Sequence, residues 1–592
     1  MTVQADLITR YLSEEDKENA NKFESYTKLR GFVADSYIKK WAMDNIYTPD
    51  IVEAHKNADF HVHDLSDALV PYCKGHDATK LMTKGLITQT VVAGKPRHLT
   101  SFFDQCVNMI AYNQQHWAGA QALSNLNTLA APYVRKHYDN LVDMGVAVDT
   151  AWIMTFNHVK QSVQSFVYNL NFPSRAGSQT PFTNIILNFL CPAMMSDEVV
   201  LVPDMDGTWG DYEKEARMIL KAFNEVFYEG DTRGRPFTFP VTTINLLPTM
   251  DYDDPLWIKL IETQIKFGTY SFFNYDGSGI DPNSILSMCC RLQIDLNELA
   301  PTGGRWAYAG ETGSIGVITL NMGKLGYQAR DKADFYKRLD NLLRLAKNAL
   351  VMKGIFIEKY KYRFMPFDMT YGTDLTRFFR TIGVVGLHEM CVNFFGKPLS
   401  ESQGFVLEVL DYMREWTRTA QMETGVLWNL EMTPAEGCST RMAIKNKEQF
   451  GDDIFTQGVE GAYYYTNMIT PPNQELTFTE RIRAEEDILS KFSGGTVHRI
   501  YFGEGYLDAN VVAKIVERIA KNTRIPYFDI APTYSICEKC GTYHPGVVEN
   551  CGECGGNAVT YDRIVGYYRP RNQANSGKYL EITERRSARL SI

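Results

Sequence analysis

Four cysteines close to the C-terminus constrain the local fold more than any other feature of the sequence. They form two Cys-x2-Cys pairs separated by ten residues: Cys537, Cys540, Cys551 and Cys554. Two such pairs present four thiolates to one tetrahedral ion, and the glycine after each pair suits a tight turn. Because four cysteines leave no open coordination position, we expect a structural zinc ion in a zinc ribbon. Unrelated thiols, or a redox-active pair, are the alternative.

Composition and charge exclude several classes of protein. The 592 residues are 44% hydrophobic and 22% charged, which is ordinary for a globular protein. The net charge of −9 contains no long run of one sign, which argues against a general binder of nucleic acid or of anionic membranes. We find neither a signal-peptide pattern nor 18 uninterrupted apolar residues. We therefore expect a cytoplasmic protein whose 11 cysteines are thiols or metal ligands.

Apolar spacings predict a mixed α/β body. Apolar residues recur at intervals of three and four in five segments, which we predict as helices: 27–43, 212–228, 329–351, 374–394 and 401–423. Between these segments lie β-branched runs, which we predict as strands: 237–246, 315–321 and 497–502. Helices that alternate with buried strands favour a sheet wrapped by helices. The one clear break in composition lies near residue 530.

Two short segments carry residues that could do chemistry. The first is Arg563-Ile-Val-Gly566-Tyr567, which follows the cysteines; an isolated glycine of this kind usually ends a strand or forms a turn. The second is Ser287-Met-Cys289-Cys290-Arg, in a long stretch between strands. Buried free cysteines usually act as small hydrophobic residues, and that interpretation suits three others: Cys106, Cys191 and Cys391.

An ordered set of motifs resembles the anaerobic ribonucleotide reductases, which are glycyl-radical enzymes. From about residue 18 to the end, the chain carries ENAN, HVHD, QTPF, MCCR, TPAE, the four cysteines and RIVGY in the family's order. The resemblance implies a ten-stranded α/β barrel wrapped by helices, with a C-terminal zinc ribbon and radical loop. It divides the chain into an extension (1–17), the catalytic barrel (18–530), the ribbon (531–558) and the radical loop with its tail (559–592).

The resemblance also implies a radical relay between two residues. It maps the stored radical onto Gly566 and the substrate-attacking cysteine onto Cys290. A glycine radical lies between a donating amide nitrogen and a withdrawing carbonyl, and it is most stable when flat. A thiyl radical can take hydrogen from the ribose C3′ because the S–H and C–H bonds have comparable strengths. The radical can therefore be stored on glycine and used on sulfur.

Further thiols and a carboxylate complete the expected site. Cys73, which follows HVHD, maps onto the thiol that assists loss of the 2′-hydroxyl; the alternative is an inert buried thiol. Cys289 is a candidate for re-reduction, and Cys438 is a lesser one. Glu436 could act as a general base on a ribose hydroxyl. Alternatively, Thr433-Pro-Ala-Glu436 is a capping box that starts a helix.

Two positions are candidates for contact with substrate. His63 lies on one face of a short strand with His61; a metal pair is conceivable, but we expect hydrogen-bonded structural histidines because no third ligand is obvious nearby. Ser314 occupies the position at which the family pattern has Asn, so a contact with the sugar would be shorter or mediated by water. Ribonucleotides, by family resemblance triphosphates, are the expected substrates.

The resemblance further implies partners and regulation. No Cys-x3-Cys-x2-Cys motif occurs in the chain, so we expect a separate iron–sulfur activase that uses S-adenosylmethionine. The polar tail at 571–578 is expected to pack weakly, so that the loop can open to the activase. The Cys289-Cys290 doublet favours a small dithiol protein (thioredoxin or glutaredoxin type) over formate as reductant. A homodimer with dNTP effectors is expected. Since only 17 residues precede the segment that resembles the family's catalytic body, we expect no N-terminal ATP-binding module.

Two other functions are compatible with parts of this pattern. A glycyl-radical acyltransferase or lyase would also use cysteines and a glycine, but the ribbon beside the glycine and the HVHD and TPAE segments disfavour it. A non-catalytic zinc-ribbon protein that binds nucleotide or nucleic acid is the other alternative. Net acidity and the lack of basic and aromatic clusters disfavour that class.

The cysteine spacing yields a direct test of the metal site. We expect one zinc per chain, and we expect a variant that combines Cys537→Ser with Cys540→Ser to lose it, because two thiolates cannot hold the ion alone. Elemental analysis of the purified proteins measures this. Stoichiometric zinc in the variant would show that the four cysteines are not its ligands.

Overall fold

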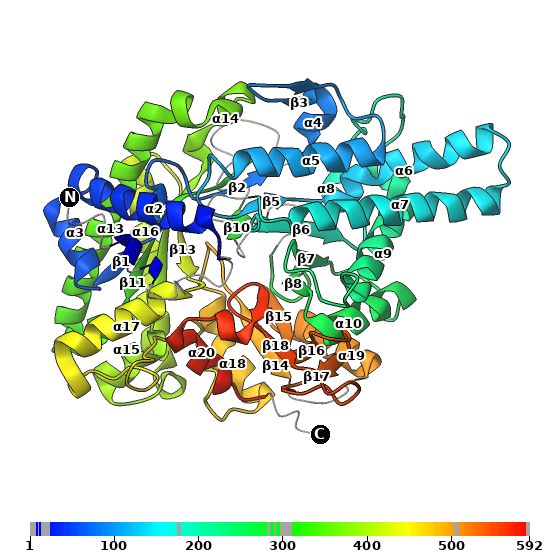
Figure 1. Cartoon of the computed structure of the whole chain (residues 1–592). Coiled ribbons are helices and arrows are strands. Elements are labelled where there is room, and N and C mark those ends of the chain that lie inside the picture. The colour runs from blue at the N-terminus through cyan, green and yellow to red at the C-terminus, as the bar shows by residue number, and fades with distance from the viewer. Residues whose placement is uncertain are drawn as a thin grey trace.

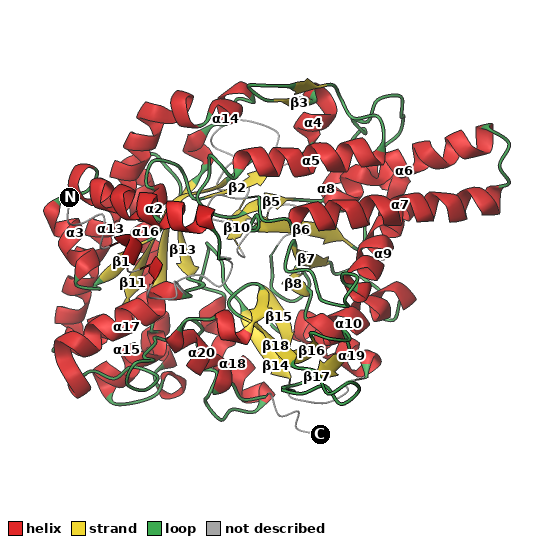
Figure 2. Ribbon diagram, in the orientation of Figure 1, coloured by secondary structure: helices red, strands yellow, loops and turns green. Residues whose placement is uncertain are grey.

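The structure, a computed structural model, describes residues 7–9, 11–12, 24–174, 179–280, 285–288, 292–295, 311–502 and 508–587. A large mixed sheet forms the centre of the molecule, and helices cover its outside (Figures 1 and 2). Ten strands of the described chain follow one another across this sheet: β13 (Trp428–Met432), β12 (Phe379–Val385), β11 (Gly313–Asn321), β2 (Cys73–His76), β5 (Gln121–Leu123), β6 (Thr183–Asn188), β7 (Val241–Leu246), β8 (Tyr270–Asn274), β15 (Tyr527–Pro532) and β14 (His498–Phe502).

The sheet consists of two parallel halves that run in opposite directions. Strands β2, β5, β6, β7 and β8 are parallel to one another. Strands β15 and β14, and strands β13, β12 and β11, are also parallel. The two junctions, β11 with β2 and β8 with β15, are antiparallel. A parallel bridge between Glu431 and Gly495 joins β13 to the start of β14. The predicted ten-stranded α/β barrel is therefore confirmed.

Helices wrap the barrel because most of them pair one apolar face with one polar face. They are α2 (Tyr26–Asn45), α3 (Pro49–Lys56), α4 (Thr79–Lys84), α5 (Leu99–Asn113), α6 (Leu126–Asp143), α7 (Val148–Leu170), α8 (Ala193–Ser196), α9 (Glu213–Glu229), α10 (Pro255–Phe267), α12 (Met322–Gln328), α13 (Lys332–Phe364), α14 (Pro366–Thr370), α15 (Leu387–Phe395), α16 (Gln403–Thr424), α17 (Gly437–Phe450), α18 (Phe478–Leu489), α19 (Ala509–Asn522) and α20 (Ser576–Thr583). Within the described ranges, none of these helices combines the length and the apolar character needed to cross a bilayer.

The structure confirms most of the predicted elements and corrects one of them. Four of the five predicted helices overlap α2, α9, α13 and α16, and the predicted strands overlap β7, β11 and β14. The fifth predicted helix, 374–394, is wrong in its first half, where β12 forms a fully buried strand. An apolar run of this kind is buried on both faces of a parallel sheet, and its spacing also resembles that of a helix. Gly386, with φ of 77°, separates this strand from α15.

One edge of β11 is interrupted near the centre of the barrel. β1 (Phe60–Val62) pairs with residues 318–320, and β2 pairs with residues 313–314. Because β12 occupies the other edge of β11, both short strands lie on the same edge. The intervening residues 63–72 therefore leave the sheet, and they include a short helical turn at Leu65–Asp67. This excursion carries polar side chains into the site described below.

The C-terminal part of the chain adds a small antiparallel sheet beside the barrel. Its order is β17 (Tyr543–Pro545), β16 (Tyr534–Cys537), β18 (Ala558–Arg563) and β19 (Tyr568–Pro570). Residues 564–567, which include Gly566, connect β18 to β19, so the sheet that holds the cysteine cluster also carries the glycine. Two further strand pairs are β3 (Leu86–Ile87) with β4 (Val92–Ala93), and β9 (Ile285–Met288) with β10 (Leu292–Asp295).

The expectation that the tail at 571–578 packs weakly is wrong. Asn575 caps α20 by accepting a hydrogen bond from the backbone N–H of Lys578, whose side chain is buried. Gly577 lies so close to α17 that an added Cβ would be 2.5 Å from Thr440 Oγ1. The small residue that suggested flexibility thus permits close packing. Figure 1 shows α20 lying between α17 and α18.

Candidate active site

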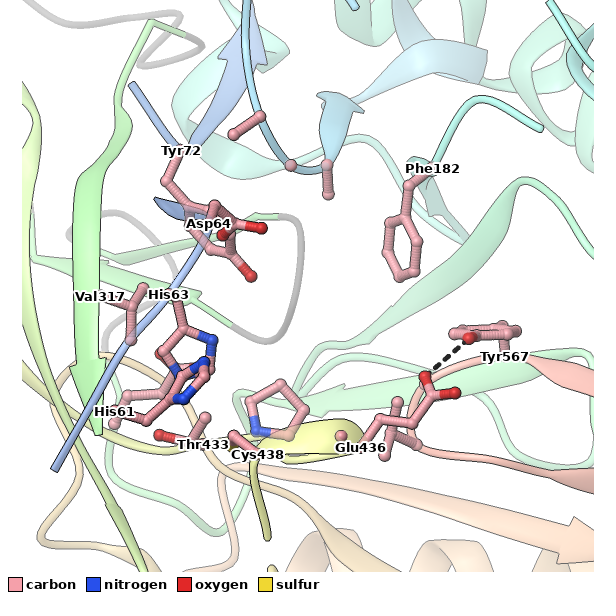
Figure 3. Close-up of a pocket in the computed structure, with 18 of the residues that line it drawn as sticks. His61, His63, Asp64, Tyr72, Phe182, Val317, Thr433, Glu436, Cys438 and Tyr567 are labelled. Atoms are coloured by element: carbon pink, nitrogen blue, oxygen red, sulfur yellow. Dashed lines mark hydrogen bonds between the residues drawn. The ribbon is translucent and has the colours of Figure 1, made fainter. Parts of the chain in front are cut away.

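A cavity of about 400 Å³ lies inside the barrel (Figure 3). Three connecting segments contribute to its wall: the excursion after β1, the connection from β13 into α17, and the loop from β18 to β19. Strand residues on both sides of the barrel complete the wall, among them Asn184, Val317 and Asp529. The interrupted edge of β11 and the C-terminal sheet therefore meet around one enclosed space.

Gly566 lies on the wall of this cavity. Apart from its two chain neighbours, no heavy atom of the described residues lies within 4 Å of a Cβ built on it, and its φ lies outside the left-handed region. Its carbonyl oxygen is 3.5 Å from Arg563 Nη2. Neither backbone conformation nor packing therefore demands a glycine at this position.

The capping-box prediction for Thr433–Glu436 is wrong. Helix α17 begins at Gly437, and the Glu436 side chain makes no capping bond. The hydroxyl of Thr433 is instead 2.8 Å from that of Thr319 on β11. The helix starts later than the motif suggests because this hydroxyl is engaged across the barrel wall.

Glu436 points into the cavity and binds the residue that follows the glycine. The hydroxyl of Tyr567 donates a hydrogen bond of 2.8 Å to Glu436 Oε2 (Figure 3). Burial and the neighbouring carboxylate raise the pKa of Tyr567 well above its ordinary value, so its hydroxyl stays protonated. A hydrogen bond on the cavity wall therefore joins the loop at 564–567 to the segment at 433–436.

Histidines form the opposite wall, and they are hydrogen-bonded as expected. His63 Nε2 is 2.8 Å from Thr319 Oγ1, and Arg441 Nε donates to His61 Nδ1 at 3.1 Å. Burial lowers the pKa of His63 to about 3 and that of His61 well below its ordinary value. Both rings are therefore neutral, and because His61 Nδ1 accepts a bond, its proton lies on Nε2.

The cysteines predicted for catalysis lie in different environments. Cys438, in the first turn of α17, lines the cavity, and burial raises its pKa to about 12. Cys73, the first residue of β2, is buried with Ala120 and next to Tyr72 and Phe182, both of which line the cavity. Cys289 and Cys290 lie outside the described residues.

Ser314 lies within the sheet. Its hydroxyl donates to the carbonyl of Gly316 at 3.0 Å and is 3.0 Å from Thr381 Oγ1. It is buried, and it is not among the residues that line the cavity. A contact with a sugar would therefore require the hydroxyl to exchange one of these bonds.

The four ribbon cysteines converge as their spacing predicts. Their sulfur atoms all lie within 4.8 Å of one another, with Cys537 and Cys554 at 3.4 Å and Cys540 and Cys551 at 3.6 Å. Tetrahedral thiolate ligands of zinc are separated by about 3.8 Å, since each Zn–S bond is about 2.3 Å. The donor set therefore fits one zinc ion. In the part of the chain that the structure describes, no other His, Cys, Asp and Glu cluster fits a metal.

Sequence reasoning did not identify several charged residues of the cavity wall. Asp529, on β15, accepts two bonds of 2.9 Å from Arg499 on β14, and Arg563 Nε is 3.3 Å from it. Arg441 lies one helical turn after Cys438. The sequence signal that could have identified Arg499 and Asp529 is a charged residue within an apolar strand, as in VHRIYF and YFDIAP. A charge buried in this way requires a partner of opposite charge.

Comparisons with known proteins agree on one family. The sequence profile described as "Anaerobic ribonucleoside-triphosphate reductase" matches residues 18–587. The enzyme of that name from Haemophilus influenzae is 24% identical over 96% of this chain and 83% of its own length. That of enterobacteria phage T4 is 21% identical over 96% of both chains. A structure of the anaerobic ribonucleotide reductase from Thermotoga maritima with dATP and CTP has the same fold, with a TM-score of 0.76 and 24% identity over 98% of this chain and 94% of that one.

The neutral histidines predict how stability depends on pH. The folded pKa of His63, about 3, lies below the unfolded value of about 6.5. Its contribution to stability is therefore complete above pH 6.5 and is lost as the pH falls, because only the unfolded chain then takes up the proton. By pH 5 the loss for this residue is about 2 kcal/mol. Urea unfolding at pH 7 and pH 5 should show a smaller decrease for His63→Gln than for the wild type. Equal decreases would contradict a neutral His63.

Proposed function

The chain belongs to the anaerobic ribonucleoside-triphosphate reductase family, and we propose that it reduces ribonucleotides to deoxyribonucleotides with a radical stored on Gly566. The observation that carries this assignment is that Gly566 and the pair of Tyr567 with Glu436 lie on the wall of one cavity. Family membership favours this oxidoreductase reaction over a glycyl-radical acyltransferase or lyase, and over a non-catalytic zinc-ribbon protein.

We propose that Gly566 and Cys290 exchange one hydrogen atom. The glycine radical takes the hydrogen of the Cys290 thiol, which restores glycine and leaves a thiyl radical. The thiyl radical then takes the C3′ hydrogen of the ribose, and the reverse transfers return the radical to the glycine. The space beside Gly566 supports the first step, because no side chain of the described residues, its chain neighbours aside, lies within 4 Å of a Cβ built on it.

Reduction of the sugar also requires acid–base groups and a source of two electrons. We propose that Glu436, held by Tyr567, accepts the proton of a ribose hydroxyl as general base. Cys73 is the proposed thiol that assists departure of the 2′-hydroxyl as water, with Cys289 in re-reduction and Cys438 as a lesser candidate. Ser314 and His63 are proposed contacts of the sugar. Cys438 and His63 line the cavity, and Cys73 lies just behind its wall.

Cys537, Cys540, Cys551 and Cys554 are proposed to hold one structural zinc ion, which supplies no chemistry at the cavity. Strand β16 ends at Cys537, which pairs with Ala558 at the start of β18, and β18 leads to the loop of Gly566. The metal would therefore stabilise the sheet from which the radical loop extends.

The partners and regulation are proposals drawn from the family. They comprise an iron–sulfur activase that uses S-adenosylmethionine, a thioredoxin- or glutaredoxin-type reductant or formate, dNTP effectors, and a second copy of the chain. The Thermotoga maritima relative has been seen with dATP and CTP, and with dATP in a specificity site. We propose triphosphates as substrates, since the family is named for them. Free cysteines support a cytoplasmic location.

The proposed reaction can be tested with the activated protein and a ribonucleoside triphosphate under strict anoxia. We expect deoxyribonucleotide from the wild type and none from Cys290→Ser, because a serine O–H bond is too strong for a glycine radical to break. Electron paramagnetic resonance should still detect the glycyl radical in this variant. Substantial product from Cys290→Ser would remove Cys290 from the relay.

Oxygen provides an independent test of where the radical resides. A carbon radical in the backbone reacts with dioxygen, and the chain should break at Gly566 when activated protein is exposed to air. Mass spectrometry should then detect loss of the segment that starts there. The Gly566→Ala variant and unactivated wild type are the controls, and both should stay whole. Cleavage at another residue would place the radical elsewhere.

A further inference from the structure

We infer that Arg499 and Arg585 are positioning residues that hold the loop of Gly566 inside the barrel, and that α20 forms part of the latch which must open before activation. This inference rests on the proposed function for its purpose, but the contacts that support it are independent of that function. They involve the backbone carbonyls of three consecutive residues just before the glycine.

Arg499 binds the loop from the barrel. One of its guanidinium nitrogens, Nη2, donates to the carbonyl oxygen of Val565, the residue before Gly566. The same guanidinium donates two bonds of 2.9 Å to Asp529, from Nε to one carboxylate oxygen and from Nη2 to the other. Burial disfavours the charged form, but Asp529 outweighs it and raises the pKa of Arg499 above its ordinary value. A fixed, charged donor on β14 therefore binds the peptide group that precedes the glycine.

Arg585, two residues after the end of α20, binds the loop from the chain's C-terminal segment. Its Nη1 donates to the carbonyl of Arg563 at 2.8 Å, and its Nη2 donates to that of Ile564 at 3.4 Å. Glu581, one turn earlier in α20, holds Nη2 at 3.0 Å. The same carboxylate also pairs with the buried Lys578. The Glu581 carboxylate of α20 therefore orients the guanidinium of Arg585.

Helix α20 is in turn fixed to the segment that carries Glu436. Asn575, its N-cap, accepts a bond of 3.0 Å from Thr440 Oγ1 on α17. The amide of Asn575 also donates to the carbonyl of Glu436 at 3.4 Å. The tail therefore connects the general-base segment to the radical loop behind the cavity wall.

These contacts determine which hydrogen bonds must break when the loop leaves the barrel. Side chains from outside the loop bind the carbonyls of residues 563, 564 and 565, whereas the carbonyl of Gly566 is reached by Arg563, the last residue of β18. If residues 564–567 leave the barrel, the bonds from Arg499 and Arg585 must break. Weakening Arg585 should therefore favour the open loop and disfavour the docked one that turnover requires.

Hydrogen exchange of the unactivated protein tests the latch directly. In Arg585→Gln, we expect amides of residues 564–568 to exchange about tenfold faster, because two charge-assisted bonds to the loop are lost. The matched control is Arg586→Gln: this next residue bonds to Asn473 and Glu475 and, within the described part of the chain, forms no hydrogen bond or ion pair with the loop. Exchange in that variant should equal the wild type.

A second variant separates latching from folding. Arg585→Lys retains the charge beside Glu581, but its single ammonium cannot present the two nitrogens that bind the two carbonyls, so we expect an intermediate exchange rate. Zinc content should match the wild type in both Arg585 variants, and a cooperative thermal transition should show that both are folded. Unchanged exchange at 564–568, or an equal increase in Arg586→Gln, would overturn the inference. If Arg585→Gln does not fold, the lysine variant alone decides.

Activation then links the latch to catalysis. At a short, fixed activation time, Arg585→Gln should contain at least as much glycyl radical per chain as the wild type, measured by electron paramagnetic resonance. Its turnover per radical should be about tenfold lower. Unchanged turnover per radical would contradict the positioning role. If the wild type forms no radical at all, the proposed function fails, and the exchange experiment still decides the latch.

Discussion

The carboxylate of Asp529 binds two guanidinium groups in the interior of the protein, and the C-terminal sheet depends on it for its place. Arg499 comes from the neighbouring barrel strand, whereas Arg563 comes from the end of β18. Removing one partner of such a buried set leaves an unpaired charge, which costs about 3–5 kcal/mol. The requirement for charge balance therefore fixes the small sheet, and the loop that extends from it, against the barrel.

Two irregularities of the barrel bring polar side chains to the cavity. A continuous strand beside β11 would present alternating side chains and leave no polar excursion; the gap between β1 and β2 brings Asp64, Ser66 and Asp67 to the cavity instead. Similarly, α17 starts later than its sequence suggests, so Glu436 faces Tyr567 and not its own helix. Both features place reactive groups on backbone that the surrounding sheet holds rigidly, which is what preorganised sites require.

Sequence predicted what depends on local spacing and failed where distant segments compete. The convergence of Cys537 and its three partners follows from two short turns, and it is confirmed. The start of α17 was predicted wrongly because the hydroxyl of Thr433 bonds to Thr319, 114 residues earlier in the chain. The tail is buried because it packs on α17. That helix is distant from the tail in the sequence, so local sequence patterns could not predict the contact. Placement of the Cys290 segment stays a prediction.

Glycines in this fold serve two distinct requirements. At Gly577, and at Gly313 where an added Cβ would lie 2.0 Å from the carbonyl oxygen of Cys73, a side chain has no room. At Gly566 a methyl group would fit and the backbone would accept it. Within the described residues, packing therefore gives no reason for glycine at this position, whereas the proposed radical does give one. If that proposal holds, replacement of Gly566 by alanine removes reactivity and leaves the architecture in place.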